Sequence, residues 1–211
     1  VGNGDGSPAS YSWQVDLTPP GVAVDSGPDG PTGDTTPTVG FSAEAGATLT
    51  CSVDQGSPSF APCAGASSHT PAAALAEGAW TFRVRATDAA GNQATATRAV
   101  VVDTTAPETE IGARTAALVN SAVASFSFTG SDAGSGVASL RCKLDNAAFA
   151  VCTSPREYTD LAEGPHSFQV RAFDAAGNAD ATPASHTWTV DLTPPAVQID
   201  SGPSGFSGDP T

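Results

Sequence analysis

The sequence has no methionine, a single lysine (Lys143) and only 14% charged residues. Because the first residue is Val1, we expect either a processed product or a window cut from a longer chain. No apolar run approaches the roughly 20 residues that a membrane-spanning helix needs, and no signal peptide opens the chain. No long stretch shows the apolar period of a helix. These absences argue against membrane insertion and against a helical fold.

Positive charge is scarce as well. Lys and Arg total 8 against 22 Asp and Glu, which gives a formal net charge of −14. Such a surface repels nucleic-acid phosphates and anionic lipids, whereas it favours solubility and divalent cations. We therefore expect no nucleic-acid partner.

A six-residue phrase occurs three times, as VDLTPP (15–20), VDTTAP (102–107) and VDLTPP (190–195). Each copy ends an alternating apolar run and stiffens on proline, as a linker after a strand does. The copies are 87 and 88 positions apart, a length that suits one small β domain. We predict whole domains at 21–107 and 108–195. Residues 1–20 then form the C-terminal strand and linker of a preceding domain, and residues 196–211 the first strand of a following one.

The end of the chain repeats its beginning. Residues 2–20 resemble 177–195 and residues 21–36 resemble 196–211, both at an offset of 175 positions. The middle joint, ATRAVVVDTTAPETEI, is less similar to either. The simplest account is an alternating array in which two domain types form one superrepeat.

Short alternating runs of Val, Thr, Phe and Ala, with 22 Gly and 17 Pro, are typical of short strands and tight turns. In the first domain we predict strands near 21–25, 37–43, 48–53, 58–63, 79–87 and 94–102. In the second they fall near 109–113, 123–129, 138–144, 148–153, 165–173 and 183–190. This pattern predicts an all-β fold of Greek-key β-sandwiches.

Four cysteines form two close pairs, Cys51 with Cys63 and Cys142 with Cys152. Three pairings are formally possible, but the within-domain pairing repeats in both domains and needs no contact between them. A turn signal between the members of each pair favours a disulfide across a hairpin. Zinc is the rival interpretation, although neither pair has C-x-x-C spacing or a histidine at ligand spacing. Disulfides would indicate an oxidising, secreted or cell-surface location.

Four phrases resemble bacterial immunoglobulin-like (Ig-like) repeat domains: FRVRATDAAGN (82–92), FQVRAFDAAGN (168–178), SDAGSGV (131–137) and the VD-T-P joints. The resemblance covers nearly the whole chain and implies tandem Ig-like sandwiches, as in secreted adhesins, surface stalks and extracellular filaments. It says little about activity, since one fold serves many proteins.

Acidic residues should converge where a linker enters a domain, because the loops after the second strand and before the last strand lie at that end. Carboxylate and carbonyl oxygens are the ligands that Ca²⁺ prefers, and in several arrays of the resembling family calcium clamps the joints. Turn chemistry alone is the favoured interpretation, because Asp and Asn bond the local backbone in turns. Ca²⁺ at the interdomain joints is the alternative and the one candidate cofactor, although Glu44 departs from the Asp of SDAGSG. The candidate ligands are Asp16, Glu44, Asp88 and Asn92 for the first domain, and Asp103, Asp132, Asp174 and Asn178 for the second.

Other candidate chemistry is thin. The three histidines stand alone, the glutamates of the repeated LAEG phrase suit a turn, and the tryptophans suit a core or a joint between domains. A G-x-S-x-G nucleophile is missing, and we predict no catalytic residue. The residues interpreted as structural are His69, His166, His186, Glu77, Glu163, Trp13, Trp80 and Trp188.

The sequence therefore predicts a structural, non-enzymatic extracellular repeat protein that forms a filament, stalk or adhesin shaft. Its expected partner is itself, as an end-to-end array in one chain or as a homopolymeric filament, and the sequence identifies no adhesion ligand. The alternative is an Ig-like spacer, or a carbohydrate- or host-binding module, of a larger secreted protein.

Overall fold

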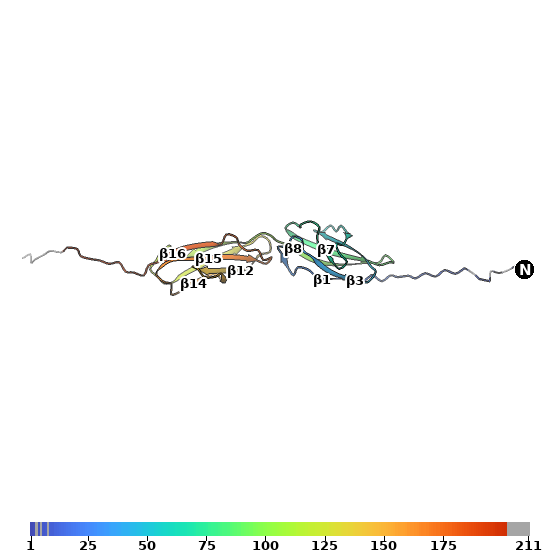
Figure 1. The fold of residues 1–211 in the computed structure, drawn as a ribbon, viewed down its shortest axis with the longest axis horizontal. Helices are drawn as coiled ribbons and strands as arrows, with labels where there is room; N and C mark the ends of the chain where they lie inside the picture. Colours follow the sequence, from blue (N-terminus) through green and yellow to red (C-terminus); the bar gives the residue numbers. More distant parts are fainter. Residues whose placement is uncertain (3, 5, 8, 202–211) are drawn as a thin grey trace, which may run out of the picture.

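A computed structural model describes residues 1–201 except 3, 5 and 8. Every regular element in the described residues is a β-strand. The strands form two sandwiches that lie end to end along the long axis, with the terminal segments extending away from the two ends (Figure 1). Residues 202–211, part of the predicted following domain, lie outside the described residues.

The first sandwich is built from a three-stranded and a five-stranded sheet. Their orders are β1-β3-β6 and β2-β8-β7-β4-β5. Its strands are β1 (Val22–Ser26), β2 (Pro31–Thr32), β3 (Val39–Ala43), β4 (Thr48–Asp54), β5 (Ala61–Pro62), β6 (Ser68–His69), β7 (Gly78–Thr87) and β8 (Gln93–Val102).

The second sandwich repeats this plan, with sheets β14-β11-β9 and β10-β16-β15-β12-β13. Short strands β2 and β10 run parallel to the last strand of their domains, and all other pairings of named strands are antiparallel. Its strands are β9 (Glu108–Arg114), β10 (Leu118–Val119), β11 (Ala124–Ser131), β12 (Val137–Leu144), β13 (Ala150–Val151), β14 (Arg156–Tyr158), β15 (Gly164–Asp174) and β16 (Ala184–Val190).

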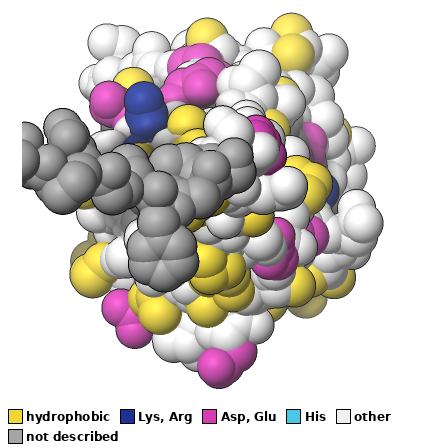
Figure 2. Space-filling model, turned by 90° about the vertical axis from the view of Figure 1, so that its left-hand side faces the viewer, with side chains coloured by type: hydrophobic (Ala, Val, Ile, Leu, Met, Phe, Trp, Pro, Cys, Tyr) yellow, Lys and Arg dark blue, Asp and Glu magenta, His cyan; other side chains and the backbone are white. Residues whose placement is uncertain are grey.

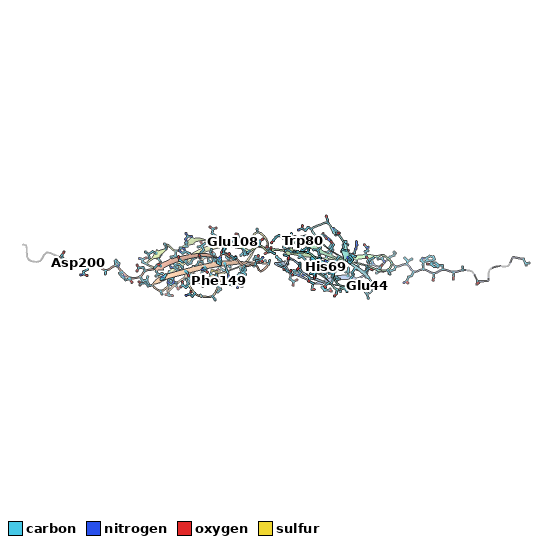
Figure 3. The ribbon with its side chains drawn as sticks, turned by 45° about the horizontal axis from the view of Figure 1, so that its top comes forward. Glu44, His69, Trp80, Glu108, Phe149 and Asp200 are labelled. Atoms are coloured by element: carbon cyan, nitrogen blue, oxygen red, sulfur yellow. A yellow bond between two sulfur atoms is a disulfide. The ribbon has the colours of Figure 1, made fainter. Side chains whose placement is uncertain are left out.

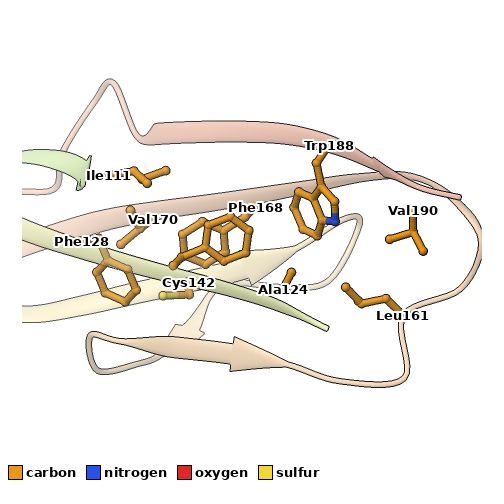
Figure 4. Close-up of a cluster of buried hydrophobic side chains, with 10 residues drawn as sticks. Ile111, Ala124, Phe128, Cys142, Leu161, Phe168, Val170, Trp188 and Val190 are labelled. Carbon is orange, nitrogen blue, oxygen red and sulfur yellow. The ribbon is translucent and has the colours of Figure 1, made fainter. Parts of the chain in front are cut away.

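Alternation along the central strands places one face of each sheet in the core. In β15, Phe168, Val170 and Ala172 are fully buried, while the residues between them face outward. Phe168, which Figure 4 shows within the buried cluster, stacks on Phe126 of the opposite sheet with ring centroids 4.3 Å apart. Burying one such side chain contributes about 1.5–3 kcal/mol, so these contacts dominate the stability of a small sandwich.

All twelve predicted strands are present, with ends within about three residues of the prediction. The exceptions in size are β5 and β13, which are shorter than expected. The short strands β2, β6, β10 and β14 were not predicted, because segments of two or three residues carry no apolar period. The all-β sandwich fold is confirmed.

Both within-domain disulfides are confirmed. Cys51 bonds to Cys63 and Cys142 bonds to Cys152, with Cα atoms 4.9 and 5.8 Å apart. Each bond joins the central strand β4 or β12 to the chain at the neighbouring edge strand, β5 or β13. The disulfides therefore fasten an edge strand that has few main-chain bonds.

The terminal segments contain no strand in the described residues. Tyr11 and Trp13 are 85% and 74% exposed, so the expected burial of Trp13 is wrong for this chain. The matching residue of the second domain, Trp188, is 2% exposed. Trp13 is exposed because no sheet in the described residues pairs with its segment.

Candidate metal centre at the joint between the sandwiches

The linker leaves β8 at Asp103, which is fully buried. Its main-chain N–H donates to the carbonyl of Thr32 at 3.0 Å, which ties it to the first sandwich. Its carboxylate faces the other way: Oδ1 accepts from the N–H of Thr105 at 3.1 Å and Oδ2 from the N–H of Ser135 at 2.6 Å. Asp103 therefore contacts both sandwiches with one residue.

Three carboxylates meet at this joint. One oxygen each of Asp103, Asp132 and Asp174 lies within 4.8 Å of the others, and in the described residues this is the one such group of three or more His, Cys, Asp or Glu side chains. Asp132 follows β11 and Asp174 ends β15. The structure thus brings together these three carboxylates of the predicted site.

In the Asp132 carboxylate, one oxygen accepts hydrogen bonds and the other has no hydrogen-bond partner. Oδ2 accepts from the N–H groups of Gly134 and Gly136 at 3.1 and 2.6 Å. Oδ1 is buried and has no hydrogen-bond partner. A buried carboxylate oxygen without a donor is costly, so a cation beside it would relieve an unfavourable contact.

Hydrogen bonds keep Asp103 ionised in spite of its burial. The hydrogen bond from the side chain of Ser135 is the main cause of a lowered pKa of Asp103, with further help from the N–H groups of Ser135 and Thr105. The ion pairs of the described residues include none to Asp103, Asp132 or Asp174. Three clustered carboxylates without a basic partner repel one another, and a divalent cation would offset this repulsion.

Gly134 leaves the space that the cluster needs. A Cβ atom at this position would overlap the carboxylate of Asp103. Because the glycine lies in the SDAGSG loop, the small residues of this phrase allow the loop to approach the linker. Gly134 is therefore required because no larger residue fits against Asp103, and not because the backbone needs to be flexible there.

Asn178 fastens the linker from the second sandwich. Its Nδ2 donates to the carbonyls of Asp103 and Thr105 at 2.9 and 3.3 Å and to Oδ2 of Asp174 at 2.7 Å. Its N–H donates to Oδ1 of Asp174 at 2.7 Å. A Cβ atom on Gly33 of the first sandwich would lie 3.2 Å from Oδ1 of Asn178, so the two sandwiches are close here.

Glu77 fastens the linker from the first sandwich, and sequence reasoning missed this role. Its carboxylate accepts from the N–H of Thr104 at 2.8 Å and from the Thr104 hydroxyl. Glu163, at the matching position of the second domain, accepts from the Thr193 hydroxyl of the exit linker at 2.7 Å. The repeated LAEG phrase and the repeated threonines were the available signal.

The entrance to the first sandwich has half of this arrangement. Asn92 donates to the carbonyl of Asp16 at 3.1 Å and to Oδ2 of Asp88 at 2.8 Å, as Asn178 does at the second entrance. The amide side chain of Asn92 is the main cause of a lowered pKa of Asp88. Glu44 instead accepts from the N–H of Gly21 at 3.2 Å. Asp16, Glu44 and Asp88 therefore form no carboxylate cluster in the described part of the chain.

The remaining candidates have structural contacts. Trp80 donates from Nε1 to the carbonyl of Ala76 at 2.9 Å, and Trp188 is buried, so neither forms an exposed stacking platform. His166 lies between the carbonyl of Ala162 and the carboxylate of Asp145, each at 2.9 Å. An open groove beside it is lined by Asp145, its one acid among the described residues, and by the hydroxyl residues Ser167, Thr187 and Thr189. No helix of the described residues has the length and apolarity needed to cross a membrane.

Comparison with known proteins finds one family model that matches part of the chain. Residues 14–104 match the model of the bacterial Ig-like domain family. No curated protein sequence matches the chain. Among solved structures, the fibronectin(III)-like modules of Clostridium thermocellum CbhA align with 84% of this chain and 100% of their own, at 19% identity and a TM-score of 0.48. A 1.5-MDa bacterial ice-binding adhesin aligns with 84% of this chain and 67% of its own, at 17% identity and a TM-score of 0.45.

Proposed function

Residues 14–104 match the bacterial Ig-like domain family, and from this match we propose that the chain is a structural, non-enzymatic segment of an extracellular Ig-like array. The array serves as a filament, stalk or adhesin shaft, and its unit is the alternating two-domain superrepeat. Its partner is a further copy of the same unit, joined end to end.

The repetition of one joint chemistry carries this proposal. The middle joint has an asparagine bond from the following domain (Asn178 to Asp103) and a glutamate bond from the preceding domain (Glu77 to Thr104). The entrance has the asparagine half, Asn92 to Asp16, and the exit has the glutamate half. The exit linker also repeats the main-chain bond of the middle joint, since Asp191 donates to Val119 as Asp103 does to Thr32. Both ends thus present complementary halves of a joint.

The chemistry of the two domains suits an extracellular role. Each small sandwich is fastened by a disulfide, and cysteine pairs of this kind persist in oxidising compartments. Carboxylate side chains are spread over the end of the molecule in Figure 2, while Lys and Arg are few. A highly acidic surface keeps a long array soluble.

Calcium at the middle joint completes the proposal. Asp103, Asp132 and Asp174 would hold the ion, and the unpartnered Oδ1 of Asp132 is the observation that fits it. Ca²⁺ accepts six to eight oxygen ligands, so carbonyls and water would supply the remainder. When bound, the ion would hold the two sandwiches in one orientation, because its ligands come from the linker, from the loop after β11 and from the end of β15.

Electron microscopy of the native assembly tests the shaft. We expect long uniform fibres with an axial period of two domains. Dispersed short particles would overturn the proposal and favour a binding module of a larger protein. Adding a calcium chelator to the fibres should reduce their straightness without separating the domains, because the linker is covalent.

Titration of the 211-residue chain with Ca²⁺ in a calorimeter tests the metal site separately. We expect one binding event per chain, lost in Asp132→Asn. Glu44→Gln is the matched control, since Glu44 occupies the corresponding loop of the first domain and contacts Gly21 instead. Equal binding by all three proteins, or none by the wild type, would overturn the calcium proposal and leave the shaft proposal to the microscopy.

A further inference from the structure

The outer face of the five-stranded sheet of the second sandwich has a row of alternating cations and aromatic rings. The guanidinium of Arg171 lies 4.4 Å from the ring centre of Phe149 and 5.0 Å from that of Phe173. Arg141 lies 4.4 Å from Phe173, and the ammonium of Lys143 lies 5.2 Å from Phe149. We call these five residues the basic row.

The basic row concentrates positive charge without neutralising it. Arg141 and Arg171 are directly opposite each other on β12 and β15, a placement that like charges destabilise. None of the ion pairs of the described residues involves Arg141, Lys143 or Arg171. The Nε atoms of both arginines are buried without a hydrogen-bond partner. Three of only 8 Lys and Arg residues therefore gather on one face of a chain with net charge −14.

The first sandwich shows that the fold does not need the whole row. Its Arg85 stacks on Phe60 at 4.0 Å, as Arg171 stacks on Phe149. Thr50 and Ser52, however, stand beside Cys51 where Arg141 and Lys143 stand beside Cys142. One arginine on one phenylalanine is thus enough to build this edge of the sheet, and the two further cations require another explanation.

The opposite sheet of the second sandwich has the complementary charge. Glu108, Glu110 and Glu157 are exposed on β9 and β14. They pair with Ser131, Thr129 and Ser125 of β11, which are also exposed, so all three glutamates share the outer face. Figure 3 labels one residue from each side, Phe149 of the basic row and Glu108 of this acidic face.

We propose that the basic row of one chain docks on the acidic face of a second copy, so that chains associate side by side. Such a contact uses two different surfaces of the same domain, so each copy keeps one surface free for a further copy unless the rotation between copies closes a ring. The stacked arginines are held in place by the aromatic rings, which reduces the entropy lost on docking. At physiological salt, charges more than about 8 Å apart are screened, so the local complementarity prevails over the repulsion between the net charges.

An array would multiply this contact. One basic row per two-domain superrepeat gives parallel shafts many weak contacts in series, whose combined strength exceeds that of each one. This amplification rests on the proposed array, whereas the contact itself does not. The two can therefore fail independently.

The single lysine permits a sharp test. A carbodiimide couples amines to carboxylates in direct contact, and besides the N-terminal amine of Val1 only Lys143 can react. A mixture of ¹⁴N- and ¹⁵N-labelled 211-residue chains at 0.15 M NaCl separates links between copies from links within one copy by mass spectrometry. We expect mixed-isotope links from Lys143 to Glu108, Glu110 or Glu157, reduced about tenfold in Arg141→Thr. Arg83→Gln, which removes one charge from the first sandwich, is the control and should leave the links unchanged.

Sedimentation equilibrium provides the second measurement. The double variant with Arg141→Thr and Lys143→Ser has at these positions the residue types of Thr50 and Ser52 in the first sandwich. It should therefore fold with an unchanged melting temperature and associate about tenfold more weakly. Glu110→Gln should weaken association in the same direction. A wild type that is monomeric at all concentrations, without mixed links, overturns the proposal. Retention of the chain on an acidic polysaccharide in place of self-association, lost in the double variant, would also overturn it and assign the row to that ligand.

Discussion

The side-chain amide of Asn178 donates to the main-chain carbonyl of Asp103, 2.9 Å away and 75 positions earlier in the chain. This bond connects the loop before the last strand of the second sandwich to the residue with which the linker begins. The same residue types make the corresponding bond at the first entrance, from Asn92 to Asp16. A domain of this type therefore holds its own linker, whether or not a metal ion is bound.

Replacing Asn178 by alanine should destabilise the second sandwich. The change leaves the buried carboxylate of Asp174 without one donor and frees the linker carbonyls, which should cost about 1–3 kcal/mol in free energy of unfolding. Urea denaturation of the full chain measures the loss. Asn92→Ala is the control: because its partner Asp16 lies in an exposed segment, we expect the smaller effect there. Equal losses would show that the linker bond contributes nothing beyond the local turn.

Gly134→Ala should disrupt the joint without changing any charge. The added methyl overlaps the carboxylate of Asp103, so the SDAGSG loop or the linker has to move. We expect a loss of about 1–3 kcal/mol in stability, together with loss of Ca²⁺ binding in the calorimeter. Gly136→Ala is a poor control because its φ is +79°, whereas Ala133→Gly leaves the contact intact and should bind calcium as the wild type does. Wild-type calcium affinity in Gly134→Ala would contradict the assigned cluster.

The sequence predicts the fold well because the signals of a β-sandwich are local. Alternation in FRVRA and FQVRA sets the buried faces of β7 and β15, and the cysteine spacing sets the hairpin pairs. The short strands β2 and β10 are not predicted, because a strand of two residues cannot show an alternating pattern. Their parallel pairing with the last strand depends on how the chain crosses between sheets, which is a long-range property.

The candidate site, too, is only partly predictable from the sequence. Chain order predicts that Asp103, Asp132 and Asp174 lie at one end of the domain, because Asp103 and Asp132 directly follow strands and Asp174 is the last residue of one. It cannot predict that Glu44 turns to the N–H of Gly21, since this depends on side-chain length and on the path of the linker. Nor does it predict the reach of Glu77 to Thr104 across the joint. The sequence signals this contact through the repeated LAEG phrase and the repeated threonines of the linkers.

Removing one disulfide should destabilise one domain only. Cys142→Ala with Cys152→Ala opens a ring of 10-residue separation, and the loop-entropy model gives a loss of about 2–3 kcal/mol. Differential scanning calorimetry should show the transition of the second sandwich at a lower temperature and that of the first unchanged. The Cys51 and Cys63 double variant should show the reverse. A shift of both transitions in either variant would mean that the sandwiches unfold as one cooperative unit.

The two sandwiches should respond to pH in opposite directions near neutrality. Hydrogen bonding to the carbonyl of Ala162, and then to Asp145, raises the pKa of His166 above its ordinary value of 6.5. Its stabilisation of the second sandwich is therefore complete below pH 6.5 and is lost as pH rises through the raised pKa. Burial lowers the pKa of His69 below 6.5, so the first sandwich is destabilised as pH falls from 6.5 through that lowered pKa.

Calorimetric scans between pH 5 and 8 check both signs in one sample. The transition of the second sandwich should move to lower temperature as pH rises, and His166→Gln should flatten this dependence while leaving that of the first sandwich intact. His69→Gln should do the converse. If His166→Gln preserved the pH dependence of the second transition, then His166 would not be the group whose titration causes it. The histidine would then act only as a packing partner of Trp188, on which it stacks at 5.4 Å.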